Sequence, residues 1–194
     1  MNGMRATLMT AALIGLATAA RAAGPDVGAA APAFTLTTLD GQPFSLSDAA
    51  KSHKAVVVMF IATKCPYSNA YNDRMRDMAA AYEKRGVLFV GINSNKTEPA
   101  DEVRDHAKKH GFAFPLMKDP ENKVADLYDA RHTPEIYVVD PAGKLRYHGR
   151  IDENYEEPSK VNSPDLKNAL EEMLTGKSIA KAETKAFGCS IKRV

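Results

Sequence analysis

Short apolar runs, and segments that alternate apolar with polar residues, predict a succession of β-strands along the chain. Residues 34–46 alternate around Asp40-Gly41, a pattern typical of a β-hairpin. Runs rich in β-branched residues are too short for core helices and predict strands buried on both faces. Three such runs cover 55–61, 87–92 and 134–140, and a turn at 141–143 leads into a fourth strand at 144–149.

Helical spacing of apolar residues fills the intervals between these strands. Pro66 and Gly86 bracket one predicted helix, and Thr97 and Gly111 bracket another. The predicted helices cover 48–51, 66–85, 98–110, 119–128 and 163–174. Alternation of strands and helices predicts parallel pairing through right-handed crossovers, to which the hairpin adds antiparallel strands. We therefore expect one α/β domain at 27–175, with a central mixed sheet flanked by helices, and a polar tail at 176–194.

The N-terminal residues have the layout of a signal peptide. A short segment containing Arg5 precedes an uncharged run at 6–20, and Ala20-Arg21-Ala22 forms a small-residue cleavage pattern. An uncleaved membrane anchor is the alternative, but a span needs about 20 apolar residues. We expect residues 1–22 to be removed, leaving a periplasmic protein that is not stably inserted in the membrane. Such a compartment is oxidising.

Composition and charge narrow the function. The 194 residues are 44% hydrophobic and 26% charged, which is typical of a globular protein and excludes disorder and coiled coil. The net charge of +2 comes from scattered basic residues, so nucleic acid is not an expected partner. Two cysteines are too few for a disulfide framework or a four-cysteine zinc site. Thiol chemistry stays open.

Cys65 is the centre of the candidate chemistry. It lies where the strand at 55–61 gives way to the helix at 66–85. Unpaired N–H groups and the helix dipole stabilise a thiolate at such a position, and Lys64 adds positive charge. The alternative is a buried structural cysteine.

Two motifs carry a resemblance to a known superfamily. Residues 60–68, with Cys65-Pro66-Tyr67-Ser68, resemble the active-site corner of thioredoxin-fold proteins. Thr133-Pro134 before an apolar strand resembles the second signature, in which the Thr-Pro bond is cis and faces the reactive sulfur. The N-terminal hairpin, a helical insertion and the tail are similar to exported peroxiredoxin-like redoxins of the AhpC/TSA type.

The resemblance implies a thioredoxin-like fold and an enzyme that exchanges or reduces disulfides, or reduces peroxides, through a nucleophilic cysteine. A protein or small-molecule disulfide or a peroxide would be the substrate and a thiol the reductant, with no organic cofactor and no metal. Two departures matter. Ser68 stands where a dithiol enzyme has its resolving cysteine, and Val58 and Ala62 stand where peroxiredoxins have the proline and threonine of their motif. The peroxidase motif is therefore incomplete.

The second cysteine, Cys189, has three possible roles. It could resolve an intermediate on Cys65, form a structural bridge, or have no partner. Since lone cysteines seldom stay independent in an oxidising compartment, we expect some Cys65–Cys189 linkage. The candidate catalytic set is Cys65, Cys189, Pro134, Thr133 and Ser68. His132 is a candidate proton donor and Arg131 a candidate thiolate partner.

Two other function classes remain open. Copper chaperones also use an exported thioredoxin fold, and here Cys65, Cys189 and histidines 53, 132 and 148 could supply soft and imidazole ligands. The closely spaced cysteine pair of those proteins is missing, so such a site would need the tail to fold back. A binding module that has lost catalysis is the third possibility. Substrate, reductant and oligomeric state are not decided by the sequence.

Overall fold

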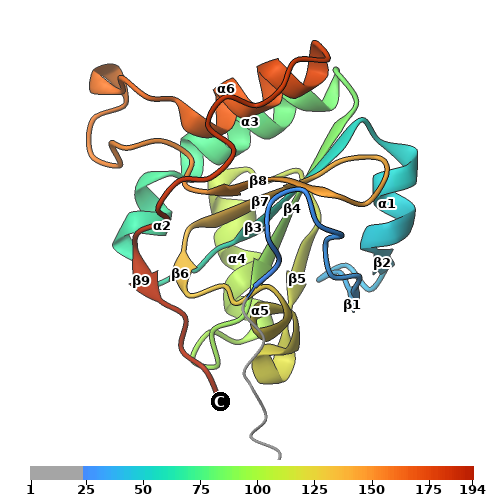
Figure 1. Ribbon diagram of the computed structural model, residues 1–194. Helices are drawn as coiled ribbons and strands as arrows, with labels where there is room; N and C mark the ends of the chain where they lie inside the picture. The colour runs from blue at the N-terminus through green and yellow to red at the C-terminus, as the bar shows by residue number, and fades with distance from the viewer. Residues whose placement is uncertain (1–23) are drawn as a thin grey trace, which may run out of the picture.

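A mixed sheet forms the centre of the protein in the computed structural model, which describes residues 24–194 (Figure 1). The predicted signal peptide at 1–22 lies outside the described residues. The sheet has five strands in the order β5-β4-β3-β7-β8. Their bounds are Ala55–Phe60 for β3, Val87–Asn93 for β4, Leu116–Lys118 for β5, Glu135–Val139 for β7 and Leu145–Gly149 for β8. Strands β3, β4 and β5 are parallel, whereas β7 and β8 are antiparallel to their neighbours.

Helices cover both faces of this sheet, as the alternation of elements predicted. They are α1 (Leu46–Ser52), α2 (Pro66–Ala70), α3 (Asn72–Glu83), α4 (Ala100–His110), α5 (Lys123–Leu127) and α6 (Asp165–Leu174). Two 3₁₀ turns cover Pro120–Asn122 and Pro158–Lys160. The hairpin is β1 (Thr35–Thr37) paired antiparallel with β2 (Pro43–Ser45), as expected. In the described part of the chain, no helix has the length and hydrophobicity to span a bilayer.

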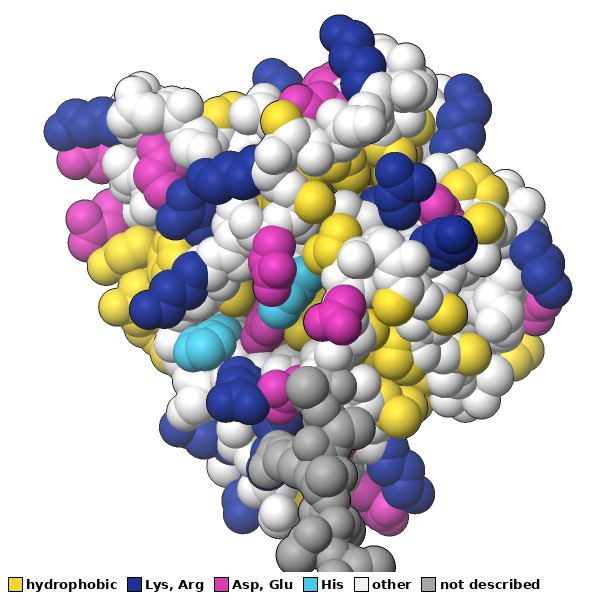
Figure 2. Space-filling view, in the orientation of Figure 1, with side chains coloured by type: hydrophobic (Ala, Val, Ile, Leu, Met, Phe, Trp, Pro, Cys, Tyr) yellow, Lys and Arg dark blue, Asp and Glu magenta, His cyan; other side chains and the backbone are white. Residues whose placement is uncertain are grey.

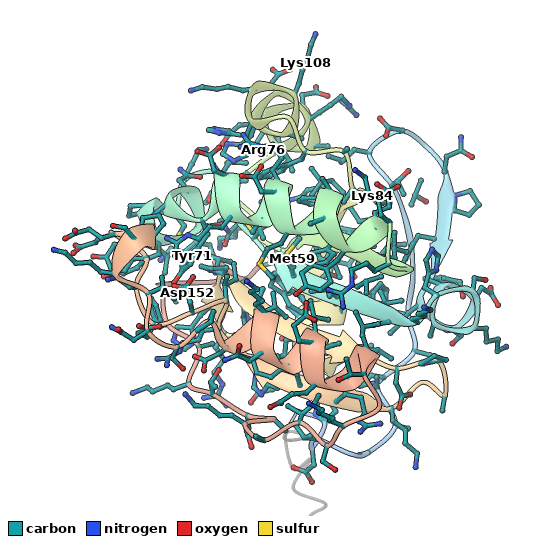
Figure 3. The ribbon with its side chains drawn as sticks, turned by 90° about the horizontal axis from the view of Figure 1, so that it is seen from above. Met59, Tyr71, Arg76, Lys84, Lys108 and Asp152 are labelled. Atoms are coloured by element: carbon teal, nitrogen blue, oxygen red, sulfur yellow. The ribbon has the colours of Figure 1, made fainter. Side chains whose placement is uncertain are left out.

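Strand β3 separates two hydrophobic clusters because successive side chains point to opposite faces. Val57 and Met59 pack with α3 and α6, and Figure 3 shows Met59 between these helices. Val56 and Val58 pack on the other face with α1, α5 and the hairpin. All six side chains of β3 are fully buried, as its unbroken apolar sequence predicted.

The helix predicted at 66–85 is wrong in one respect, because it divides at Tyr71 into α2 and α3. The Tyr71 hydroxyl donates to Asp152 Oδ1 at 2.9 Å, and the same carboxylate accepts from Arg74 at 2.7 Å. Tyr71 and Asp152 point toward one another in Figure 3. Apolar spacing continues through this break, so periodicity cannot detect it.

Other differences lie at the ends of elements and in short strands. Helix α4 begins at Ala100 after Pro99, and the predicted cap Thr97 does not cap it. The predicted helix at 119–128 is a 3₁₀ turn followed by α5. Strand β5 was missed because three residues are too few for a periodic signal.

The tail was expected to be polar and to bring Cys189 to Cys65, and in the structure it packs along the molecule. Thr184, Ala186 and Ile191 are buried, and Ile191 belongs to the cluster beneath α1 and α5. In Figure 1 the tail runs from α6 across the end of the sheet to α2, and there forms β9 (Cys189–Ser190) beside β6 (His132–Thr133). The tail is therefore part of the folded domain.

We expect Leu170→Ala to lower the free energy of unfolding by about 3 kcal/mol, because it removes a fully buried side chain of α6 and leaves a cavity. Urea unfolding followed by circular dichroism measures this. Leu127→Ala is the matched control, since Leu127 is 50% exposed and its loss should cost less than about 0.5 kcal/mol. Equal losses would contradict the assignment of α6 to the core.

Candidate active site

Cys65 lies on the loop after β3 and caps the N-terminus of α2. Its sulfur accepts a hydrogen bond from the Ser68 N–H at 3.4 Å, and its thiol donates to the Thr133 carbonyl at 3.1 Å. Pro66 fits the first helical position, because a backbone N–H there would have no partner within the helix and its absence costs nothing. The Cys65 residue is only 3% exposed. The predicted position at a strand-to-helix corner is therefore confirmed, and the corner is covered.

The strand that faces Cys65 begins at the second predicted motif. The Thr133-Pro134 peptide bond is cis, as the resemblance implied. Thr133 lies in β6 and turns its carbonyl oxygen to the Cys65 sulfur. Pro134 links β6 to β7, so the central sheet fixes the loop that faces the thiol.

Ser68 is fully buried in the first turn of α2. Its hydroxyl accepts the Ala62 N–H at 3.2 Å, while its backbone N–H points to the Cys65 sulfur. The side chain thus ties α2 to the end of β3, and the contact with Cys65 comes from the backbone.

The tail brings Cys189 to Cys65. Strand β9 pairs antiparallel with β6, with Cys189 opposite Thr133. The Thr133 carbonyl also accepts the Cys65 thiol at 3.1 Å, so this pairing puts Cys189 beside Cys65, and both cysteines are unbridged. Burial, together with the hydrogen bond to Cys65 and its charge, raises the pKa of Cys189 to about 11. At neutral pH Cys189 is therefore a protonated thiol beside Cys65.

The tail strand is held tightly on both sides of Cys189. A Cβ on Gly188 would lie 2.1 Å from the Thr133 carbonyl oxygen, so only glycine permits this approach. Beyond the cysteine, the Ile191 N–H donates to the Arg131 carbonyl at 3.0 Å. The Lys192 N–H donates to Asn95 Oδ1 at 2.7 Å. Backbone pairing and the absence of a side chain at 188 together place Cys189.

Glu135 supports the loop beneath Pro134 and was not recognised in the sequence. Its side chain is 4% exposed and accepts the N–H groups of Arg131 at 2.7 Å and His132 at 2.8 Å. His148 Nε2 lies 2.8 Å from the same carboxylate. Burial by itself raises the pKa of Glu135, but the hydrogen bonds from His148 and these two N–H groups outweigh it and hold the pKa below its ordinary value. Glu135 is thus a buried carboxylate that orders the loop.

Glu98 plays the matching role on the other side of Cys65. It is 2% exposed and accepts the N–H of Thr63 at 2.8 Å and of Lys64 at 3.2 Å. Asn95 also donates to this carboxylate, at 3.1 Å, and so connects it to the tail. Lys118 donates to the Glu98 carbonyl at 2.7 Å, and burial lowers the pKa of this lysine. A carboxylate predicted at the start of a surface helix gave no signal of this role.

Arg131 was a candidate thiolate partner and His132 a candidate proton donor, but their side chains make other contacts in the structure. The Arg131 guanidinium pairs with Asp129 at 2.7 Å. The His132 side chain is 39% exposed, and its Nδ1 lies 3.8 Å from Glu135. Both residues serve the site through backbone groups, because their N–H groups bind Glu135 and their chain pairs with the tail.

Two of the three histidines considered for copper, His53 and His148, lie against other groups. His53 Nδ1 lies 2.8 Å from the Ala49 carbonyl at the end of α1, and His148 contacts Glu135. Across residues 24–194, no group of three or more His, Cys, Asp or Glu side chains has the arrangement of a metal site.

An aromatic cluster lies beside the cysteine pair. It consists of Tyr67 of α2, Tyr155 of the loop after β8, and Phe187 of the tail. The Tyr67 and Tyr155 ring centroids are 4.5 Å apart, and the Phe187 centroid is 6.2 Å from each. Figure 2 shows hydrophobic side chains gathered on the side of the molecule where α2 lies in Figure 1.

A cysteine at a helix N-terminus, opposite a cis-proline on a mixed five-stranded sheet, defines the class of thioredoxin-like redoxins. The chain belongs to the AhpC/TSA family, whose model matches residues 27–148. The fold and the family that the two motifs suggested are thus confirmed.

Known proteins agree with this class. The structure of a hypothetical protein from Sinorhizobium meliloti 1021 has a TM-score of 0.80 and 31% identity, over 87% of this chain and 95% of that chain. The protein named Thiol-disulfide oxidoreductase ResA of Geobacillus thermodenitrificans is 29% identical over 120 residues, which cover 62% of this chain and 67% of the relative. A Mycobacterium tuberculosis protein provisionally named a peroxiredoxin is 30% identical over 127 residues, 66% of this chain and 78% of the relative.

Glu135→Gln should lower the free energy of unfolding by about 2 kcal/mol at neutral pH, since hydrogen bonds to a buried charge are lost. The folded-state pKa of Glu135 is lowered, so its contribution is complete above the ordinary value of 4.5 and disappears as pH falls through the folded value. The difference between the two proteins should therefore shrink in acid, as urea unfolding across that range will measure. Glu183→Gln is the control, because Glu183 is 73% exposed and lies 3.8 Å from the same His148. A pH-independent difference would contradict this role.

Glu98→Gln should also cost about 2 kcal/mol of unfolding free energy, because an amide offers one acceptor where the Thr63 and Lys64 N–H groups need two. It should also slow closure of a Cys65–Cys189 disulfide under mild oxidation, measured by quenched alkylation. Glu102→Gln is the control, since Glu102 contacts Thr63 and Lys64 only through their side chains at the surface. Equal behaviour of the two variants would argue against Glu98 as a positioning residue.

Proposed function

We propose that this redoxin is an exported thiol–disulfide oxidoreductase in which Cys65 attacks the substrate and Cys189 resolves the mixed disulfide. The observation that carries the proposal is the β6–β9 pairing, which sets Cys189 opposite Thr133, the residue whose carbonyl oxygen accepts the Cys65 thiol at 3.1 Å. A resolving thiol normally follows three residues after the nucleophile in a dithiol enzyme of this fold, where this chain has Ser68. The tail supplies that group from a distant part of the sequence.

The cycle consists of two thiol–disulfide exchanges. The Cys65 thiolate attacks one sulfur of the substrate disulfide, forms a mixed disulfide and releases the first substrate thiol. Cys189 then loses its proton and attacks the Cys65 sulfur, which releases the second substrate thiol and leaves a Cys65–Cys189 disulfide. The substrate gains two electrons and two protons, and an external dithiol restores the protein by the reverse exchanges.

The raised pKa of Cys189 suits it to the second step. Because the thiolate is the attacking species, the cysteine that stays protonated does not compete for the substrate. Burial is the largest cause of the raised pKa of Cys189, and formation of the mixed disulfide removes the other two, the hydrogen bond to Cys65 and its charge, which favours deprotonation of Cys189 for the second step.

Disulfide exchange is favoured over peroxide reduction by the surroundings of Cys65. Ala62 occupies the position of the peroxiredoxin threonine, and its N–H is already bound to Ser68. The name of the relative from Geobacillus thermodenitrificans also supports disulfide exchange. Export is supported by the charge and hydropathy pattern of residues 1–22, and an oxidising compartment suits a redox pair.

The test is intact-mass spectrometry after alkylation, combined with turnover. Mild oxidation of the wild type should give a species lighter by two hydrogen masses that resists alkylation until a reductant is added. Cys189→Ser, treated with oxidised glutathione, should accumulate a glutathione adduct on Cys65, whereas Cys65→Ser should not form one at a comparable rate. Turnover of glutathione disulfide with dithiothreitol should fall at least tenfold in either variant.

A hydrogen peroxide assay accompanies these measurements. Rapid peroxide consumption by the wild type, without turnover of any disulfide, would replace the proposal with peroxidase function. Two cysteines that remain alkylatable after oxidation would overturn the resolving role of Cys189.

A further inference from the structure

We propose that the docked tail displays the pattern that the active site selects in its substrate: an extended polypeptide with an aromatic residue and a glycine directly before the disulfide cysteine. In the tail these positions are Phe187, Gly188 and Cys189. The inference rests on the proposed function, because it assumes that Cys65 exchanges disulfides, and it names the class of substrate.

The tail and a polypeptide substrate compete for the same site, so β9 leaves before Cys65 attacks and returns with Cys189 after the mixed disulfide has formed, as the substrate segment gives up its contacts with β6. In the described part of the chain, β6 pairs with β9 alone, and Cys65 beneath this pair is only 3% exposed. A polypeptide disulfide reaches the Cys65 sulfur only when β9 has left. Departure of β9 frees the hydrogen-bonding edge of His132 and Thr133, and it removes Phe187 from the pair of tyrosines that it contacts. The substrate then binds the strand edge and the tyrosines that the tail had occupied.

The requirement for glycine comes from the backbone of the site. Gly188 has φ +144°, which side chains rarely permit, and a Cβ there would lie 2.1 Å from the Thr133 oxygen and 2.8 Å from its carbonyl carbon. Both atoms are backbone, and Glu135 and the central sheet hold the loop that carries them. The loop cannot give way as a flexible side chain would, so a larger residue must shift the whole segment.

The preference for an aromatic residue comes from the two tyrosines that pack against Phe187. Phe187 meets Tyr67 edge-on at 79° and Tyr155 at 58°, with centroids 6.2 Å from both. Tyr67 follows Pro66 in α2, so this contact is tied directly to the helix that carries the nucleophile. Aromatic pairs of this geometry add affinity beyond the area they bury. An aromatic side chain two residues before the cysteine is therefore selected.

The test uses the full-length protein and synthetic peptides as probes. The first peptide has the sequence Lys-Ala-Phe-Gly-Cys-Ser-Ile, with its cysteine in a mixed disulfide with glutathione. Two others carry alanine in place of phenylalanine or of glycine. Each turnover reduces the mixed disulfide to free peptide and glutathione and oxidises dithiothreitol. We expect kcat/KM to fall about tenfold for each alanine peptide.

Variants of the protein separate the two contacts. Tyr155→Ala should lower the ratio of kcat/KM between the phenylalanine and alanine peptides, because only the Tyr67 contact is left, while the ratio between the glycine and alanine peptides should persist. Leu127→Ala, on the exposed surface of α5, should leave both ratios unchanged. Because the peptide comparison uses the wild type, the test does not depend on the folding of any variant.

Two negative results have different meanings. Equal kcat/KM for all three peptides, with normal turnover of glutathione disulfide, would overturn the substrate pattern and leave the proposed function intact. No turnover of any peptide or of glutathione disulfide would overturn the proposed function itself.

Discussion

The contact between the Cys65 thiol and the Thr133 carbonyl is the constraint on which the rest of the site depends. It brings together two loops that lie outside the central sheet. Backbone N–H groups of these loops therefore have no partner in a neighbouring strand of that sheet. Buried N–H groups without partners are costly. Glu98 on one side and Glu135 on the other accept these groups and hold the loops in register. Two buried carboxylates thus maintain the geometry of one thiol.

The tail binds beside the same contact, because it pairs with Thr133. Because Thr133 lies in a strand with a free edge, the chain can add β9 there and bring Cys189 to Cys65. The shift that raises the pKa of Cys189 follows from burial and from this proximity. The covering of Cys65, the raised pKa of Cys189 and the position of Cys189 beside Cys65 therefore all follow from the pairing of β9 with β6. A resolving cysteine on α2, at the position of Ser68, would not have required the tail or its pairing with β6.

Much of the fold could be predicted because its signals are local. The apolar runs of β3 and β4 and the helical spacing of α6 depend on neighbours within one element. The division at Tyr71 could not, since it is stabilised by Asp152 from a distant loop while the apolar spacing continues. Strand β5 escaped detection because its partner, not its own composition, makes it a strand.

For the site, the sequence alone identified Cys65, the Thr133-Pro134 motif and the family, because a proline after a cysteine and a proline before an apolar strand are patterns of adjacent residues. It left the role of Cys189 open among three possibilities. Only the tertiary structure brought Cys189 beside Cys65 and gave Glu98 and Glu135 their positions. The physical reason is that these contacts depend on a free strand edge, a gap that only Gly188 fits, and buried N–H groups that need acceptors. None of these can be read from residues that are adjacent in sequence.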